Sequence, residues 1–188
     1  MSDSSVIRTF LAADIDKSLN AGIVDVQEKL KSVEAPVKFV ESENLHFTLK
    51  FFGDISKDKI NEISSVTEEK LKNHDPFSIS IEGMGVFPSL RYIRVLWIGT
   101  KDTDSFSSMQ KDLDDEFIKM GFSKERSYLP HLTIGRLKGS ANKELLVEKI
   151  EELKEVKIGN MKIDQLVLKK SELTPEGPIY TNLEVFKL

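Results

Sequence analysis

A short pattern, His-x-Thr followed by an aliphatic residue, occurs twice in this chain, as His46-Phe47-Thr48-Leu49 and as His131-Leu132-Thr133-Ile134. Each copy lies in a short apolar run, residues 45–52 and 129–137, that predicts a β-strand. Residues two apart in a strand point to the same face, so each copy presents an imidazole beside a hydroxyl. Two such strands facing one cleft would place two proton-transfer groups around a single substrate atom.

The surroundings of the two motifs are also alike, which predicts an internally duplicated chain. A strand that includes Ile7 precedes His46 by 39 residues, and a strand that includes Ile93 precedes His131 by 38. Amphipathic helical patterns fill both intervals, at residues 17–33 and 104–120. Each motif is followed by another helical pattern and then by strands, and these elements have the following ranges: helices at 57–72 and 142–153, strands at 77–81, 156–158 and 161–169.

This order predicts an α+β fold rather than an alternating parallel α/β fold. We expect one domain over residues 1–188, with approximate repeat halves at 6–88 and 91–172 and a C-terminal strand at 179–187. The Gly-rich segment 83–89 is expected to form the crossover between two lobes.

Composition limits the partners and the chemistry. The chain has no Cys, which excludes disulfides and thiol catalysis and makes a reducing cytoplasm the expected location. No apolar run is long enough for a membrane span, so no membrane partner is expected. The net charge is −4, so contact with a nucleic acid should be local, at an end or a single nucleotide. A monomer is the simplest expectation.

The chain has only three His, and the third differs from the other two. His74 lies in a polar loop without Thr two residues later, which is typical of a solvated His at a helix terminus. A metal site would need three or four ligands at suitable spacing, and the spacing of His, Asp and Glu in this chain does not indicate one. The motif Gly-x-x-x-x-Gly-Lys-[Ser/Thr] is absent, so ATP chemistry finds no support. No cofactor is expected.

Two cations near the motifs are further candidates. Strict alternation puts Lys50 on the face of His46, at the cleft rim or in solvent. Alternation keeps Arg136 off the face of His131, but a bulge at Gly135 would bring Arg136 round to cap a phosphate oxygen. The alternative is a surface Arg at a strand end. Four aromatic residues are candidates for stacking on a base, although core or rim packing is the commoner role: Phe51, Phe87, Tyr92 and Tyr128.

These residues resemble the 2H phosphoesterase superfamily, which has two His-x-[Ser/Thr]-x motifs in a duplicated fold, and within it the RNA 2′,3′-cyclic phosphodiesterase family, also called 2′-5′ RNA ligase. The resemblance covers nearly the whole chain and rests on these segments: Arg8-Thr9-Phe10-Leu11-Ala12, Leu45-His46-Phe47-Thr48-Leu49-Lys50-Phe51-Phe52-Gly53, Val95-Leu96-Trp97, Pro130-His131-Leu132-Thr133-Ile134-Gly135-Arg136 and Gly177-Pro178-Ile179-Tyr180.

The resemblance implies a bilobal fold, with two mainly antiparallel sheets lining a central cleft and helices on the outside. It implies metal-independent hydrolysis of an RNA 2′,3′-cyclic phosphate to a 2′-phosphate. In that reaction His46 donates a proton to the departing O3′, and His131 accepts one from water. Thr48, Thr133 and Arg136 hold the phosphate oxygens. The expected partner is a transfer-RNA-like or short RNA with a 2′,3′-cyclic phosphate end.

The residues alone leave several alternatives open. They do not assign the acid and base roles between the two His, which exchange when the reaction runs in the reverse direction. A 5′-hydroxyl that attacks the cyclic phosphate would form a 2′-5′ bond. The substrate could instead be a small cyclic nucleotide or a 2′-5′ oligonucleotide. A non-catalytic nucleotide-binding module is the alternative from another class. For in-line displacement, the two imidazole nitrogens should lie about 6–8 Å apart.

Overall fold

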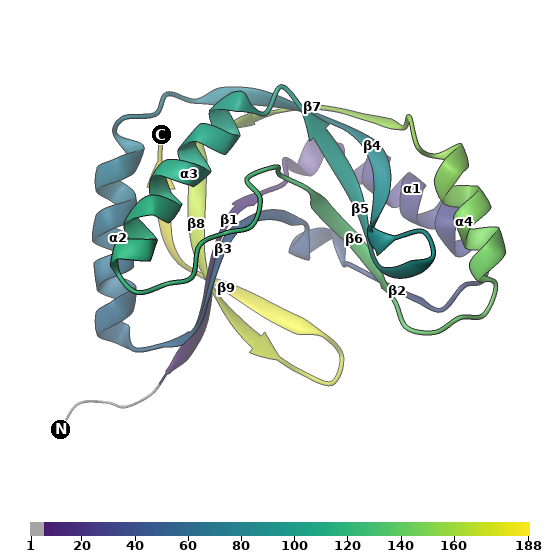
Figure 1. The fold of residues 1–188 in the computed structure, drawn as a ribbon, viewed down its shortest axis with the longest axis horizontal. Helices are drawn as coiled ribbons and strands as arrows, with labels where there is room; N and C mark the ends of the chain where they lie inside the picture. The colour runs from purple at the N-terminus through teal and green to yellow at the C-terminus, as the bar shows by residue number, and fades with distance from the viewer. Residues whose placement is uncertain (1–5) are drawn as a thin grey trace.

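The computed structural model describes residues 6–188 and contains, within that range, one curved nine-stranded sheet and four α-helices (Figure 1). None of these helices is long and apolar enough to cross a membrane. In chain order the elements are β1 (Ile7–Asp14), η1 (Lys17–Leu19), α1 (Asn20–Lys31), β2 (Val37–Phe39), η2 (Ser42–Asn44), β3 (His46–Ile55), α2 (Lys57–Leu71), β4 (Phe77–Ser89), β5 (Tyr92–Lys101), α3 (Asp104–Lys119), β6 (Leu132–Leu137), α4 (Lys143–Glu152), β7 (Lys157–Ile163), β8 (Gln165–Leu173) and β9 (Pro178–Lys187).

The predicted order of elements occurs twice, as β1-α1-β3-α2-β4 and as β5-α3-β6-α4-β7. All four helices lie within the ranges that periodicity predicts. The prediction for residues 83–89 is wrong, because this segment is the second part of β4 and not a crossover. The pairing of β4 with β5 shifts between Ile81 and Met84, and Gly83 has a φ of 76° there. This bulge lets the strand continue through the Gly-rich segment.

The sheet has two lobes that meet at β3 and β6. Its strand order is β7-β4-β5-β6-β3-β1-β8-β9, with antiparallel pairing throughout and β2 added beside β6. The α+β class and the mainly antiparallel pairing are confirmed. The two expected sheets are continuous, because Phe47 of β3 pairs with Leu132 of β6 and joins them.

Each lobe takes elements from both repeats. The β1 lobe, which we define as β3, β1, β8 and β9, has α2 and α3 on its outer side (Figure 1). The β5 lobe, defined as β6, β5, β4, β7 and β2, has α1 and α4 on its outer side. The first repeat therefore sends α1 and β4 to the β5 lobe, and the second sends α3 to the β1 lobe. The α-helices of the described residues therefore lie on the outer side of the curved sheet, and its inner, concave face carries no α-helix (Figure 1).

A β-bulge in β3 decides which side chains reach the concave face. In the pairing with β1, Leu11 lies opposite Lys50 and Ala12 opposite Thr48, so Leu49 has no partner. The extra residue shifts the alternation by one. The Leu49 and Lys50 side chains are therefore both buried, and Phe51 turns to the open side with 60% of its surface exposed. The prediction that Lys50 lies at the cleft rim or in solvent is wrong for this reason.

Phe47 and Phe51 offer matched probes of this arrangement. Phe47→Ala should lower the free energy of unfolding by about 3–5 kcal/mol, because the side chain is fully buried where the lobes join and its loss leaves a cavity. Phe51→Ala removes the same side chain from the exposed side and should cost about 1 kcal/mol, the worth of its ring contact with Phe10. Urea unfolding measures both values. Equal midpoints for the two variants would contradict the placement of the bulge.

Candidate active site

The two His-x-Thr motifs are neighbours in the sheet. Phe47 lies directly opposite Leu132, and both side chains are fully buried. The residues on either side of this pair point to the concave face, as alternation in an antiparallel pair requires. Extending this register by one residue on either side aligns His46 with Thr133 and Thr48 with His131. Each imidazole therefore stands beside the hydroxyl of the other motif.

The two histidines are diagonal neighbours in this arrangement. His46 is the first residue of β3. His131 immediately precedes β6, although the strand predicted at 129–137 included it. Diagonal positions across an antiparallel pair lie about 7–8 Å apart. The expected gap of about 6–8 Å between the imidazole nitrogens stays a prediction, which this placement supports.

His46 is held by groups from three parts of the chain. Its Nδ1 lies 2.7 Å from the Asn44 carbonyl oxygen, and the rings of Phe10 and Tyr180 lie 5.0 and 5.4 Å from the imidazole. Burial lowers the pKa of His46, while the Asn44 carbonyl and the Asp14 carboxylate oppose that shift. An Nδ1 proton donated to Asn44 leaves the Nε2 lone pair as the free basic position.

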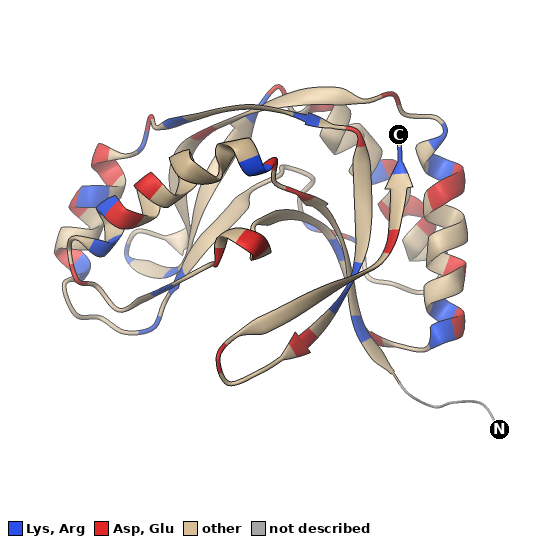
Figure 2. Cartoon of the chain, turned by 180° about the vertical axis from the view of Figure 1, so that it is seen from behind, with Lys and Arg blue, Asp and Glu red and all other residues tan. Residues whose placement is uncertain are grey.

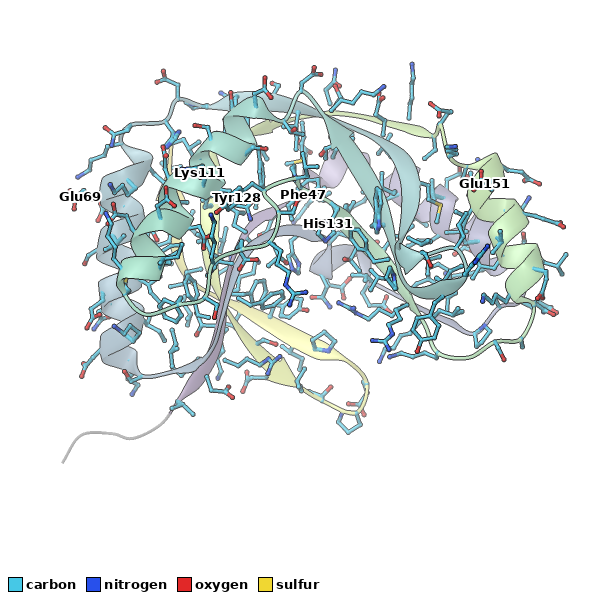
Figure 3. The ribbon with its side chains drawn as sticks, in the orientation of Figure 1. Phe47, Glu69, Lys111, Tyr128, His131 and Glu151 are labelled. Carbon is cyan, nitrogen blue, oxygen red and sulfur yellow. The ribbon has the colours of Figure 1, made fainter. Side chains whose placement is uncertain are left out.

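His131 has a similar set of contacts. Its Nδ1 lies 3.4 Å from the carbonyl oxygen of Leu129, again two residues earlier in the chain, so Nε2 is once more the free nitrogen. The rings of Phe87 and Trp97 lie 5.0 and 6.5 Å from the imidazole. Burial lowers the pKa of His131, although its side chain is more exposed than that of His46. In Figure 3, His131 lies between the two lobes, near the centre of the molecule.

A bulge in β6 brings Arg136 to the face of Thr133. Leu96 lies opposite Gly135 and Trp97 opposite Thr133, which leaves Ile134 without a partner. The bulge expected at this glycine is present, and Arg136 emerges exposed on the concave side. A Cβ at position 135 would lie 2.8 Å from Cγ1 of Val37, so the close approach of β2 leaves no space for a larger residue.

Tyr180 is a residue of this site that sequence reasoning treated only as part of a C-terminal signature. It lies on β9, and its ring contacts both His46 and Phe10, at centroid distances of 5.4 and 5.0 Å. Burial raises the pKa of the Tyr180 hydroxyl, and the positive charges of Arg136 and Arg8 oppose that shift. The tyrosine therefore lies near both arginines and beside one of the two imidazoles.

The β8–β9 hairpin that carries Tyr180 is tied to both lobes. The Asn44 side-chain amide donates to the Pro178 carbonyl at 3.3 Å, and the Lys38 ammonium donates to the Glu176 carbonyl at 3.0 Å. Asn44 thus contacts the hairpin with its side chain and His46 with its backbone. The signal in the sequence was the segment 177–180, but its distance of more than 130 residues from His46 concealed the contact.

Lys50 belongs to a buried polar network below the site. Its ammonium lies 2.6 Å from Asp114 Oδ1 and 3.2 Å from Glu125 Oε1, and it donates to the Ser123 carbonyl. Asp114 Oδ2 accepts from the backbone N–H of Glu125 and from the Tyr128 hydroxyl. Although burial of the Asp114 carboxylate opposes it, the hydrogen bond from Lys50 and the other donors hold the pKa of Asp114 below its ordinary value. The network fixes the loop that leads into His131.

The remaining candidates lie apart from one another. Phe51 and Phe87 are exposed near the motifs, whereas Tyr128 packs below the site, where burial and the Asp114 carboxylate raise the pKa of its hydroxyl to about 12. The prediction of a solvated His74 is wrong, because its side chain is only 14% exposed and its Nε2 lies 3.1 Å from Asp112 Oδ2. Within residues 6–188, no three His, Asp or Glu side chains gather as a metal site would require.

Comparison with known proteins identifies relatives over nearly the full length. Residues 23–174 match the model of the 2′-5′ RNA ligase superfamily. The RNA 2′,3′-cyclic phosphodiesterase of Methanothermobacter thermautotrophicus is 53% identical, covering 97% of this chain and 99% of the relative. The protein of the same name from Methanocaldococcus jannaschii is 40% identical, covering 93% and 96% of the two chains.

Two solved structures share the fold. The crystal structure of TT0787 of Thermus thermophilus has a TM-score of 0.83 and 24% identity, covering 97% of this chain and 98% of that one. The crystal structure of E. coli LigT in apo form has a TM-score of 0.78 and 21% identity, covering 98% and 99%. The duplicated, curved architecture of this chain is therefore that of known proteins.

The buried ion pair below the site makes a testable contribution to stability. Asp114→Ala should lower the free energy of unfolding by about 3–5 kcal/mol, because it removes the buried carboxylate of the pair and leaves the Lys50 ammonium only the partly exposed Glu125 carboxylate at 3.2 Å. Asp115→Ala breaks the exposed pair with Lys111 on the same helix and should leave the urea midpoint unchanged. The double variant Lys50→Met/Asp114→Leu should recover much of the loss. Equal effects of Asp114→Ala and Asp115→Ala would contradict this assignment.

Proposed function

This chain belongs to the 2′-5′ RNA ligase superfamily, and we propose that it hydrolyses the 2′,3′-cyclic phosphate at the end of an RNA to a 2′-phosphomonoester. Relatives with 53% and 40% identity bear the name RNA 2′,3′-cyclic phosphodiesterase over almost their whole length. The observation that carries the proposal is the pair of His-x-Thr motifs on neighbouring strands, each with an imidazole Nε2 free on the concave face.

The two imidazoles divide the proton transfers. His131 accepts a proton from a water molecule whose oxygen attacks phosphorus, and His46 donates a proton to O3′ as the P–O3′ bond breaks. The products are a 2′-phosphate and a free 3′-hydroxyl, and exchange with solvent restores the two protonation states. The cyclic ester itself supplies the driving force, so the reaction needs no metal or other cofactor in this proposal.

Three further side chains bind the phosphate. The hydroxyls of Thr48 and Thr133 donate to the non-bridging oxygens, and each stands beside the imidazole of the opposite motif. Arg136, which the β6 bulge places on the same side, supplies positive charge. Donors directed at charge that develops in the transition state each lower the barrier by a few kcal/mol.

The same geometry serves ligation, in which a 5′-hydroxyl of RNA takes the place of water, attacks the cyclic phosphate and forms a 2′-5′ bond as the P–O3′ bond breaks. His131 then accepts the proton of the 5′-hydroxyl and His46 donates one to O3′, and the two roles exchange only when the 2′-5′ bond is cleaved back to the cyclic phosphate. We propose hydrolysis as the main reaction, a short or transfer-RNA-like end as the substrate, a monomer as the active form and the cytoplasm as the location.

The direct experiment incubates the protein, in the presence of a chelator, with a short RNA that ends in a 2′,3′-cyclic phosphate. The expected product is a 2′-phosphate. His46→Ala and His131→Ala should each lower kcat by about a hundred- to ten-thousand-fold, because each removes one proton-transfer group. Thr48→Ala and Thr133→Ala should have smaller effects. Product analysis by chromatography and mass spectrometry measures both the rate and the position of the phosphate.

His74→Ala is the matched control, because it removes the third imidazole of the chain, whose Nε2 contacts Asp112 away from the motifs. It should leave the rate unchanged. Unchanged rates in both His46→Ala and His131→Ala would overturn the mechanism. If the wild-type protein hydrolyses cyclic mononucleotides but no RNA end, the proposed substrate is wrong. If the chelator abolishes hydrolysis, the proposed metal-free chemistry is wrong.

The pH dependence follows from the lowered pKa values of both imidazoles. The donor His46 must be protonated and the acceptor His131 neutral, so kcat/KM should trace a bell with its maximum below about pH 6.5. A bound phosphate anion favours imidazolium, so the bell for kcat should lie at higher pH than the bell for kcat/KM. Rates at constant ionic strength across about pH 5–8 test this. A flat profile would contradict acid–base catalysis by these groups.

A further inference from the structure

Acidic residues are missing from two segments of this otherwise acidic chain. Residues 83–101 and 126–143 together contain seven Lys and Arg and no Asp or Glu. The rest of the chain contains twenty Lys and Arg and thirty-one Asp and Glu. The first segment supplies most of β4 and all of β5, and the second contains β6. In Figure 2, acidic positions are frequent along the outer helices. The second part of β4, β5 and β6 therefore lack the carboxylates that would repel a nucleic acid, whereas β1 on the other side of the motifs carries Asp14.

The arginines differ from the lysines in their partners. Four of the five arginines lie in these two segments, and the sequence places them at Arg91, Arg94, Arg126 and Arg136. Within residues 6–188, the ion pairs are formed by Lys or His, and none involves an arginine. A guanidinium is the side chain best suited to phosphate, because its planar donors fit two oxygens at once. In the described part of the chain, the arginines are therefore not neutralised by an internal carboxylate.

A row of exposed groups lies between the motifs and the end of the β4–β5 hairpin. The Phe87 ring lies 5.0 Å from the His131 imidazole, and Phe87 is paired with Val95, the neighbour of Arg94. The Arg94 guanidinium lies 4.9 Å from the centroid of the Tyr92 ring and donates to the Tyr92 hydroxyl at 3.0 Å. Tyr92 is 58% exposed and Phe87 41%. Exposed aromatic rings interleaved with arginine are typical of surfaces that bind single-stranded nucleic acid.

We propose that the RNA on the 5′ side of the cyclic end lies along this row, with Arg94 binding a backbone phosphate and the Arg94–Tyr92 stack supporting an unpaired base. This inference rests on the proposed function. Arg136 lies opposite Val95 on the adjacent strand. The pairing of β4 with β5 shifts at this point, from Phe87–Val95 to Pro88–Ile93, so Arg94 is the extra residue of a bulge and does not follow the strict alternation that would turn it away from the face of Arg136. The two arginines therefore serve successive phosphates, and an RNA end is preferred over a cyclic mononucleotide.

The test compares kcat/KM for 2′,3′-cyclic AMP and for a trinucleotide that ends in the same cyclic nucleotide. The wild-type protein should prefer the trinucleotide by about tenfold or more, and Arg94→Ala and Tyr92→Ala should each remove most of that preference by lowering the trinucleotide value alone. Tyr92→Phe should retain it, because the ring is preserved. Arg94→Ala should also reduce the slope of log kcat/KM for the trinucleotide against log salt concentration by about 0.7.

Lys162→Ala is the matched control, since it removes one exposed cation from β7 at the far edge of the same lobe. It should leave the preference and the salt slope unchanged. Equal losses on both substrates in Arg94→Ala, an equal change in Lys162→Ala, or a wild-type protein without preference would each overturn the inference while the proposed function stands. Hydrolysis of neither substrate by the wild-type protein would overturn the proposed function, and the inference with it.

Discussion

The pairing of Phe47 with Leu132 is the contact on which the site depends. It is the pair through which the two lobes become one sheet, and both side chains are fully buried there. Neighbouring residues of a strand point to opposite faces. Burial of Phe47 and Leu132 therefore turns the His and Thr on either side of each residue to the concave face. A shift of one residue in this register would bury the His and Thr side chains and expose the core residues between them. Packing at the junction and the placement of the imidazoles are therefore one requirement.

The two bulges extend this control beyond the motifs. In β3 and β6 alike, the extra residue follows the threonine directly, and the alternation changes there. The consequence differs because the residues differ. In β3 the shift buries Lys50, which forms the ion pair with Asp114 and fixes the loop before His131. In β6 the equivalent position is Gly135, where β2 passes close, and the shift presents Arg136.

The sequence predicts local features of this protein and misses those set by distant pairing. The helices, the repeated order and the face shared by His46 and Thr48 follow from periodicity within a few residues. The burial of Lys50 does not, because a bulge depends on the partner strand. The contact of Tyr180 with His46 likewise depends on segments more than a hundred residues apart, and the exchange of helices between the repeats depends on long-range packing.

The place of β1 in the sheet has a consequence for synthesis on the ribosome. β1 precedes the other strands in the chain, yet its neighbours are β3 and β8, and β8 spans Gln165–Leu173. One edge of β1 therefore stays unpaired until β8 has left the exit tunnel. An unpaired edge is a template for association with other chains. The nascent protein is thus exposed to aggregation for most of its translation, and it is released from that hazard only when the β8–β9 hairpin arrives.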